Sequence, residues 1–292
     1  MKITEAFERG EFVVTAEVGP PKGFHIEHML EEAKTYLSGI TAVNVTDNQS
    51  SVMRLGSLAT CKALKDEGLT PIFQMTCRDR NRIALESDLL SAALFGIENL
   101  LLLTGDHTKL GDHPQAKPVF DLDSVSLIHA VKQLESGVDL GGNELVGEPP
   151  KFAKGAVVSP CSDSVDVQLA KMERKVAAGA EYFQTQAVYE PEKFIQFMEK
   201  AKQFGKPVQL GIVIPKSVGM CRYMNANVAG IHIPEEMINE LKADKEKTKA
   251  GITGVEIAAR IIRECKPYCQ GVHIMAMGWE SKVPSLLEQA GL

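Results

Sequence analysis

The sequence lacks a long apolar run and an excess of basic residues, and each absence excludes a class of protein. No apolar run approaches the roughly 20 residues of a membrane-spanning helix. Residues 1–19 carry charges where a signal peptide has an uninterrupted apolar stretch, so we expect a cytoplasmic protein with no membrane partner. The 32 Lys and Arg residues are outnumbered by 38 Asp and Glu residues. The resulting net charge of −6 argues against nucleic acid as a partner.

Paired cysteines and the common catalytic motifs are also lacking. The six cysteines are scattered without a C-x-x-C pair, which favours structural thiols over a disulfide framework. The spacing of Cys265 and Cys269 is too weak a signal to predict a metal site. No P-loop, zinc triad, or nucleophile beside a histidine base is recognisable. The chemistry is therefore expected to come from a bound cofactor.

What the chain does contain is an apolar run followed by a polar tip, repeated eight times. The runs are bounded by turn residues, as buried strands are. Eight such strands alternating with helices predict an α/β fold, a (β/α)8 TIM barrel formed as one domain by residues 1–292. An open doubly wound sheet is the alternative, but no G-x-G-x-x-G follows the first strand. The predicted strands are Phe12–Gly19, Ile40–Asp47, Thr70–Cys77, Asn99–Asp106, Gly155–Cys161, Tyr182–Tyr189, Val208–Pro215 and Gly271–Gly278.

Between these strands, apolar residues recur at helical spacing. The predicted helices are His25–Ser38, Arg82–Phe95, Asp123–Leu134, Val165–Ala178, Glu192–Phe204 and Val255–Cys265. Glycines are expected to cap several helices in the left-handed conformation, at Gly39, Gly68, Gly96, Gly179 and Gly205. Two segments exceed what a barrel needs: the polar loop His107–Leu122, and Ser217–Gly254, a helical insertion after strand seven with a solvated run at Lys242–Lys249.

Barrel enzymes keep their chemistry at the carboxyl ends of the strands, so the polar tips are the candidate site. Glu17 is the strongest, because a carboxylate flanked by apolar residues is either paired or protonated and suited to acid catalysis. Asp47, Asn48 and Asp106 could instead be turn or cap residues. The other tips are Thr46, Gln74, Thr76, Thr104, Gly105, Ser159, Gln184, Gln186, Lys216 and Ser217.

Strand alternation sends Gln184 and Gln186 to the same face, and an inward glutamine is costly unless it is hydrogen-bonded. The basic residues Lys171, Arg174 and Lys175 follow strand five in a helix. On the residues alone, a solvated surface is favoured over phosphate binding.

Several of these segments, in the same order, resemble those of the methylenetetrahydrofolate reductases. They are Glu17 with Pro20-Pro21, VNVTDN (Val43–Asn48), QMTC (Gln74–Cys77), LLLTGD (Leu101–Asp106), RKVAAGA (Arg174–Ala180) with Thr185-Gln186, and GVHIM (Gly271–Met275). The resemblance covers nearly the whole chain. It implies a barrel that binds flavin at the strands' carboxyl ends and reduces 5,10-methylenetetrahydrofolate to 5-methyltetrahydrofolate.

The resemblance also implies roles for individual residues. Glu17 would be the general acid that protonates the folate, and Asp106 would act beside the flavin and the pterin. The expected substrate contacts are Glu17, Asp106, Gln186 and Tyr189. The expected cofactor is FAD, with FMN as an alternative. Its contacts would be Thr46, Asn48, Gln74, Leu103, Thr104, Gly105, Asp106, Phe120, Ser159, Arg174 and Lys175.

The chain departs from the family pattern at several of these positions. Gln74 stands where a histidine is usual, Thr104 where an arginine is usual, and Met275 where a tyrosine is usual. The electron donor is therefore expected to be NAD(P)H or an electron-delivering partner subunit, as in shorter reductases of anaerobes, and an oligomer or hetero-complex is expected. A flavin-free pterin-binding barrel of the methyltransferase kind and a non-catalytic subunit of an electron-transfer complex are the alternatives.

Overall fold

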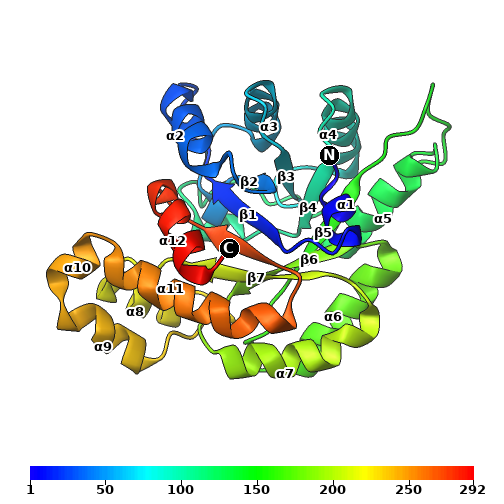
Figure 1. Cartoon of the computed structure of the whole chain (residues 1–292). Coiled ribbons are helices and arrows are strands. Elements are labelled where there is room, and N and C mark those ends of the chain that lie inside the picture. The colour runs from blue at the N-terminus through cyan, green and yellow to red at the C-terminus, as the bar shows by residue number, and fades with distance from the viewer.

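Eight parallel strands close into a barrel in the computed structural model, which describes residues 1–292 (Figure 1). Strands adjacent in sequence are adjacent in the barrel, and β8 closes it by pairing with β1. The predicted (β/α)8 barrel is confirmed. The strands are β1 (Val13–Val18), β2 (Ala42–Val45), β3 (Pro71–Thr76), β4 (Asn99–Leu103), β5 (Ala153–Val158), β6 (Tyr182–Ala187), β7 (Val208–Val213) and β8 (Gly271–Met275).

Helices surround the barrel on its outer side (Figure 1). They are α2 (Glu27–Leu37), α3 (Ser57–Asp66), α4 (Arg82–Leu94), α5 (Ser124–Glu135), α6 (Val165–Ala178), α7 (Pro191–Ala201), α11 (Ile252–Cys265) and α12 (Val283–Ala290). The predicted insertion after strand seven forms α8 (Val218–Asn227), α9 (Glu235–Ala243) and α10 (Lys245–Lys249), which gather beside α11. None of the helices is long and apolar enough to cross a membrane.

Some boundaries differ from the predicted ones for local reasons. Strand β5 begins at Ala153, two residues before Gly155, because the first pairs with β4 already form at Ala153 and Lys154. Helix α11 begins at Ile252 rather than Val255, directly after Gly251 in the left-handed region. Gly68, Gly96, Gly179 and Gly205 have positive φ values as expected, whereas Gly39 does not.

The amino ends of the strands are covered by α1 (Ile3–Glu8), a helix that the sequence patterns did not reveal. Its Ile3 and Ala6 are buried against the first residues of several strands, among them Val13 and Tyr182. Asn99 anchors the segment by accepting a 2.7 Å hydrogen bond from the Ile3 amide. Covering this end leaves the carboxyl ends of the strands as the open face of the barrel.

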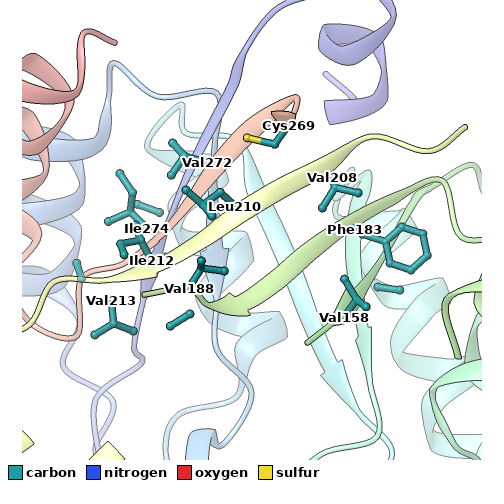
Figure 2. Close-up of a cluster of buried hydrophobic side chains, with 14 of the residues drawn as sticks. Val158, Phe183, Val188, Val208, Leu210, Ile212, Val213, Cys269, Val272 and Ile274 are labelled. Carbon is teal, nitrogen blue, oxygen red and sulfur yellow. The ribbon is translucent and has the colours of Figure 1, made fainter. Parts of the chain in front are cut away.

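Outward-facing strand residues form the larger core between the barrel and its helices. Figure 2 shows Leu210 and Ile212 of β7 beside Val272 and Ile274 of β8, and the two strands pair in that register. These residues are fully buried. Because side chains alternate along a strand, the residues between them face the inside of the barrel.

The inside of the barrel holds a layer of buried polar side chains beneath the open face. Thr15, Asn44, Gln184, Gln209 and His273, at most 3% exposed, form what we call the interior polar network. Gln184 accepts a 2.9 Å hydrogen bond from Asn44, and its own amide nitrogen lies 3.1 Å from Gln209 Oε1. The expectation that an inward Gln184 must be hydrogen-bonded is confirmed. Such a layer is stable only because its polar groups satisfy one another.

Candidate active site

Two large cavities lie at opposite ends of the barrel. The larger, about 760 Å³, lies at the amino ends of the strands between α1, α7 and the segment before β8. The other, about 450 Å³, lies at the carboxyl ends and is lined by residues from every strand but β2 and β7, and by the loop that follows β2. Barrel enzymes react at the carboxyl ends, whereas the amino face serves stability. We therefore identify the second space, which we call the mouth cavity, as the candidate active site.

Most of the site residues predicted from the sequence come together in the mouth cavity. They come from the strands β1 to β6 or from the segments that directly follow them, and the most distant pair is separated by well over a hundred residues. The predicted residues that line it are Glu17, Asn48, Gln74, Leu103, Thr104, Gly105, Asp106, Ser159, Lys175 and Gln186.

Four predicted residues lie elsewhere. Thr46 borders an adjacent cavity of about 350 Å³, which shares Glu17 and Gln49 with the mouth cavity. Arg174 lines a cavity of about 440 Å³ between α5 and α6. Phe120 lines none of these three cavities and lies with its ring centroid 6.3 Å from that of His107.

Tyr189 also lies away from these cavities, in the core outside the barrel. It is 1% exposed and donates a 2.6 Å hydrogen bond to the Val213 carbonyl. The structure therefore does not bring Tyr189 to the predicted substrate site. Tyr189 lies two residues beyond the end of β6 at Ala187, where the chain turns its side chain against β7.

Glu17 sits at the boundary between the mouth cavity and the adjacent one. It is 9% exposed, and its Oε1 accepts a 2.8 Å hydrogen bond from Gln74 Nε2. The Nε2 atom of His273 lies 3.4 Å from the same oxygen. The sequence left open whether this carboxylate is paired or suited to acid catalysis, and the structure gives it these two neighbours. Its other oxygen, Oε2, has no partner in the protein, yet it is not among the buried unpartnered atoms, which are the Thr46 and Thr108 hydroxyls. Oε2 is therefore open to the cavities.

The Thr104-Gly105-Asp106 turn presents a carboxylate at the end of β4. Gly105 has φ +90°, and a Cβ there would lie 3.0 Å from Thr76 Cβ, so the turn requires glycine. The Asp106 side chain is exposed and forms no ion pair, while Arg78 donates to the Asp106 backbone carbonyl. Thr104 accepts a 3.1 Å hydrogen bond from the Ser124 amide and so fixes the start of α5.

Asp47 has a structural role rather than a place among the reactive groups. It is 3% exposed and accepts hydrogen bonds of 2.8 Å from both the amide and the hydroxyl of Thr76. Arg80 pairs with it at 2.8 Å. Asp47 therefore behaves as the turn residue that the sequence allowed. Its negative charge is balanced by Arg80.

A strained loop forms one wall of the mouth cavity. Asn48, Ser50 and Ser51 all have positive φ values, an uncommon conformation for residues other than glycine. The backbone of Gly111 packs directly against this loop. A Cβ at residue 111 would lie 1.7 Å from the Ser51 carbonyl oxygen, so only glycine fits there. Gln49 and Ser50, which the sequence reasoning missed, therefore line the cavity. Strain of this kind clusters at functional sites.

Three cations project from α6 without a carboxylate partner. Lys171 and Lys175 line the mouth cavity, Arg174 lines the cavity next to α5, and none of them forms an ion pair. Lys175 donates a 2.6 Å hydrogen bond to the Val157 carbonyl. Burial, followed by repulsion from Lys171, lowers the pKa of Lys175 to about 8. Lys171 and Arg174 are exposed, as the solvated surface favoured by the residues alone predicts, whereas Lys175 is half-buried beside the cavity, an arrangement that suits an anionic ligand.

His273 is the main residue of the site that the sequence reasoning missed. It lines the mouth cavity from β8 and is 3% exposed. Strand alternation with Met275 would have placed it inside the barrel. Its nearness to Glu17 depends on the pairing of β8 with β1, which no local pattern specifies.

Comparison with known proteins gives consistent matches over most of the chain. The family model described as methylenetetrahydrofolate reductase matches residues 2–291. Methylenetetrahydrofolate reductase 2 of Schizosaccharomyces pombe is 24% identical over 248 residues, covering 81% of this chain and 38% of the relative. The chain thus spans well under half of that relative's length. The 5,10-methylenetetrahydrofolate reductase of Escherichia coli is 24% identical over 265 residues, covering 87% of this chain and 82% of the relative.

Solved structures share the fold at low sequence identity. An uncharacterized protein from Clostridium thermocellum that binds two copies of 5-methyl-5,6,7,8-tetrahydrofolic acid has a TM-score of 0.67 and 16% identity, covering 98% of this chain and 96% of that one. Oxaloacetate acetylhydrolase has a TM-score of 0.56 and 13% identity, covering 100% of this chain and 87% of that one. At these identities the likeness concerns the barrel alone.

Proposed function

The chain belongs to the methylenetetrahydrofolate reductase family, and from that premise we propose that it uses a flavin to reduce 5,10-methylenetetrahydrofolate to 5-methyltetrahydrofolate. The observation that supports this most is the placement of Glu17. Its carboxylate is mostly buried, held at Oε1 by Gln74, and open at Oε2 toward two adjoining cavities. That is the geometry of a positioned acid.

The residues around the mouth cavity fit a flavin nucleotide. Thr46 is 2% exposed and its hydroxyl has no partner in the protein, so a ligand group could satisfy it. Lys171, Arg174 and Lys175 offer unpaired positive charge to the phosphates. Gly105 lets the backbone at the end of β4 turn close beneath the ligand. The finer proposal is FAD, whose second phosphate Arg174 would be available to hold, and FMN is the alternative.

A bound flavin would supply the hydride in this reaction, and a residue of the protein would donate the proton. Glu17 would give a proton from Oε2 to a nitrogen of the folate's five-membered ring. The O–H bond breaks, an N–H bond forms, and the ring opens to an iminium carbon that can accept hydride. Asp106 would hydrogen-bond the pterin from the carboxyl end of β4, and Gln186 would contact the folate from β6.

The electron donor is proposed to be a protein subunit that docks on the open face. Apolar side chains stand exposed around the mouth cavity on four separate loops: Phe24 at 77%, Met53 at 49%, Leu110 at 72% and Met277 at 51%. They follow β1, β2, β4 and β8, so they lie along one side of the open face. An exposed apolar rim of this kind is typical of a protein-binding surface. NAD(P)H is the alternative donor.

One experiment tests these proposals together. The purified protein would be examined for a yellow colour, its flavin identified by mass, and its reduction followed with NADH, NADPH and reduced methyl viologen. We expect bound flavin that is reoxidised by 5,10-methylenetetrahydrofolate. A colourless protein that still binds folate would favour a pterin-binding barrel of the methyltransferase kind. A flavoprotein that is never reoxidised by folate would favour a non-catalytic electron-transfer subunit.

A further inference from the structure

Arg78 is a buried arginine between two of the loops that line the mouth cavity. It follows β3, the strand that lies between β2 and β4 in the barrel. Its side chain is 2% exposed and borders the mouth cavity. A buried guanidinium is costly unless its charge and its N–H groups have partners. The partners of Arg78 therefore determine where this side chain is held.

Asp79 neutralises the charge of Arg78. Arg78 donates a 2.8 Å hydrogen bond from Nε to Asp79 Oδ1 and a 2.7 Å hydrogen bond from Nη2 to Oδ2, so the pair is bidentate. Burial acts to raise the pKa of Asp79, but hydrogen bonding to Arg78 and the attraction of its charge act against burial, and the pKa is lowered. The pair occupies one edge of the planar guanidinium and leaves its other N–H groups for further acceptors.

These other N–H groups reach the backbone of two different loops. Nη2 of Arg78 donates a 3.3 Å hydrogen bond to the Asn48 carbonyl, in the loop after β2. Nη1 donates a 3.4 Å hydrogen bond to the Asp106 carbonyl, in the loop after β4. One side chain therefore joins the loops after β2 and β4 across the end of β3.

The two loops have backbone conformations that need support. Asn48 has φ 45°, in the left-handed region that is uncommon for residues other than glycine. Gly105, which directly precedes Asp106, packs so closely that a Cβ there would lie 3.3 Å from Cβ of Arg78. The backbone of Arg78 is itself fixed, because its carbonyl accepts a 2.8 Å hydrogen bond from the Val119 amide. Arg78 is thus a fixed point to which both loops are attached.

We propose that Arg78 is a positioning residue that sets the place of Asp106 relative to Asn48, and so orients the folate against the flavin. The inference rests on the proposed function, in which Asp106 hydrogen-bonds the pterin, and on Asn48 as an expected flavin contact. In this role Arg78 acts through two backbone carbonyls and not on the reacting atoms. Lysine would keep the positive charge, but its single ammonium cannot span Asp79 and both carbonyls.

Arg78→Lys in the flavin-loaded protein tests this role. Without the guanidinium fork, Asp106 should no longer be held in place. The half-saturating concentration of 5,10-methylenetetrahydrofolate should then rise about tenfold, as for the loss of one hydrogen bond to a charged group. Turnover at saturating folate should change less, because Glu17 is held by Gln74 and not by Arg78. An unchanged half-saturating concentration, or a loss confined to the turnover rate, would overturn the proposal.

A double variant shows whether Arg78 acts through Asp106. Asp106→Ala removes the carboxylate but keeps the carbonyl to which Arg78 donates. Adding Arg78→Lys to Asp106→Ala should therefore raise the half-saturating folate concentration no further. A second tenfold rise in the double variant would contradict the positioning role. Arg260→Lys is the matched control, since Arg260 forms an exposed pair with Glu240, and it should leave the half-saturating concentration unchanged.

Hydrogen–deuterium exchange of the flavin-loaded protein gives a readout that needs no turnover. In Arg78→Lys we expect faster exchange in residues 47–54 and 104–110 together, and unchanged exchange in residues 277–281 after β8. Faster exchange in only one of the first two segments would show that Arg78 does not join them. If Arg78→Lys does not fold, Asp79→Asn takes its place, because it keeps the arginine but removes the charge that holds it. If the wild type does not turn over folate, the proposed function fails, while the exchange measurement still decides whether Arg78 joins the loops.

Discussion

Gln74 Nε2 donates a 2.8 Å hydrogen bond to Glu17 Oε1, across the inside of the barrel from β3 to β1. The two strands are not neighbours, because β2 lies between them. The contact therefore exists because the sheet curves into a barrel and both side chains point inward at its open end. It fixes one oxygen of Glu17 and leaves the other open to ligand.

Replacing Glu17 with Gln should abolish folate turnover while sparing the flavin. The substitution keeps the shape of the side chain but removes the proton, so the folate step should slow by about 10²- to 10⁴-fold. Flavin reduction should continue at the wild-type rate in stopped-flow measurements. Glu11→Gln is a matched control, since Glu11 is exposed and pairs with Arg9. Undiminished folate turnover in Glu17→Gln would remove Glu17 from the role of acid.

Binding of a phosphate-bearing flavin to the apoprotein should weaken as the pH rises above about 8. Burial lowers the pKa of Lys175 to about 8, so the free protein loses this positive charge above that pH and keeps it below. The phosphate binds the protonated lysine, so above this pH binding must be accompanied by uptake of a proton. FAD should therefore bind about tenfold more weakly at pH 9.5 than at pH 8. Quenching of FAD fluorescence would measure the affinity.

Two comparisons control for other effects of pH on that affinity. Riboflavin lacks phosphate, so its binding should depend less on pH. Lys175→Gln should weaken FAD binding and flatten its pH profile, whereas Lys62→Gln, which alters an exposed pair with Asp66, should do neither. An FAD profile that is the same in wild type and Lys175→Gln would contradict a role for this lysine.

The six cysteines should resist alkylation in the native protein. All are buried free thiols, and burial raises the pKa of Cys77 and Cys161 to about 12 and of Cys221 and Cys269 to about 11. The thiolate is the reactive form. We expect no rapid reaction with a disulfide reagent at pH 8 and six thiols after denaturation. A thiol that reacts within seconds in the folded protein would be inconsistent with this packing.

Replacing Gly155 with Ala should destabilise the barrel. A Cβ at Gly155 would lie 2.3 Å from Cζ of Tyr182, whose hydroxyl donates to the Leu100 carbonyl at 2.8 Å. The ring cannot move without losing this hydrogen bond, so we expect a loss of about 1–3 kcal/mol in the free energy of unfolding by urea. Gly39→Ala is the control, because nothing lies within 4 Å of its Cβ and its φ is not positive. Equal stability of the two variants would disprove the fit between Gly155 and Tyr182.

The strand order and most of the site could be predicted because they depend on local patterns. An apolar run with a polar tip specifies a buried parallel strand and the end at which its tip emerges. This pattern predicted that Glu17, Gln74 and Asp106 lie at the same end of the barrel, and all three line one cavity. Tyr189, whose expected substrate contact came from the family resemblance, lies outside that cavity, because the direction of a side chain just past a strand depends on how the following turn packs.

The sequence by itself determined the barrel, its open end, and the carboxylates that line it, because periodicity and turn chemistry act over a few residues. Only the tertiary structure decided what those carboxylates touch. His273 reaches Thr15 across 258 positions of the chain because β8 pairs with β1. The tertiary structure likewise decides that the Thr46 hydroxyl is buried without a partner and that the cations of α6 line cavities. Hydrogen bonds need distances near 3 Å, and only the packed fold sets those distances between residues far apart in sequence.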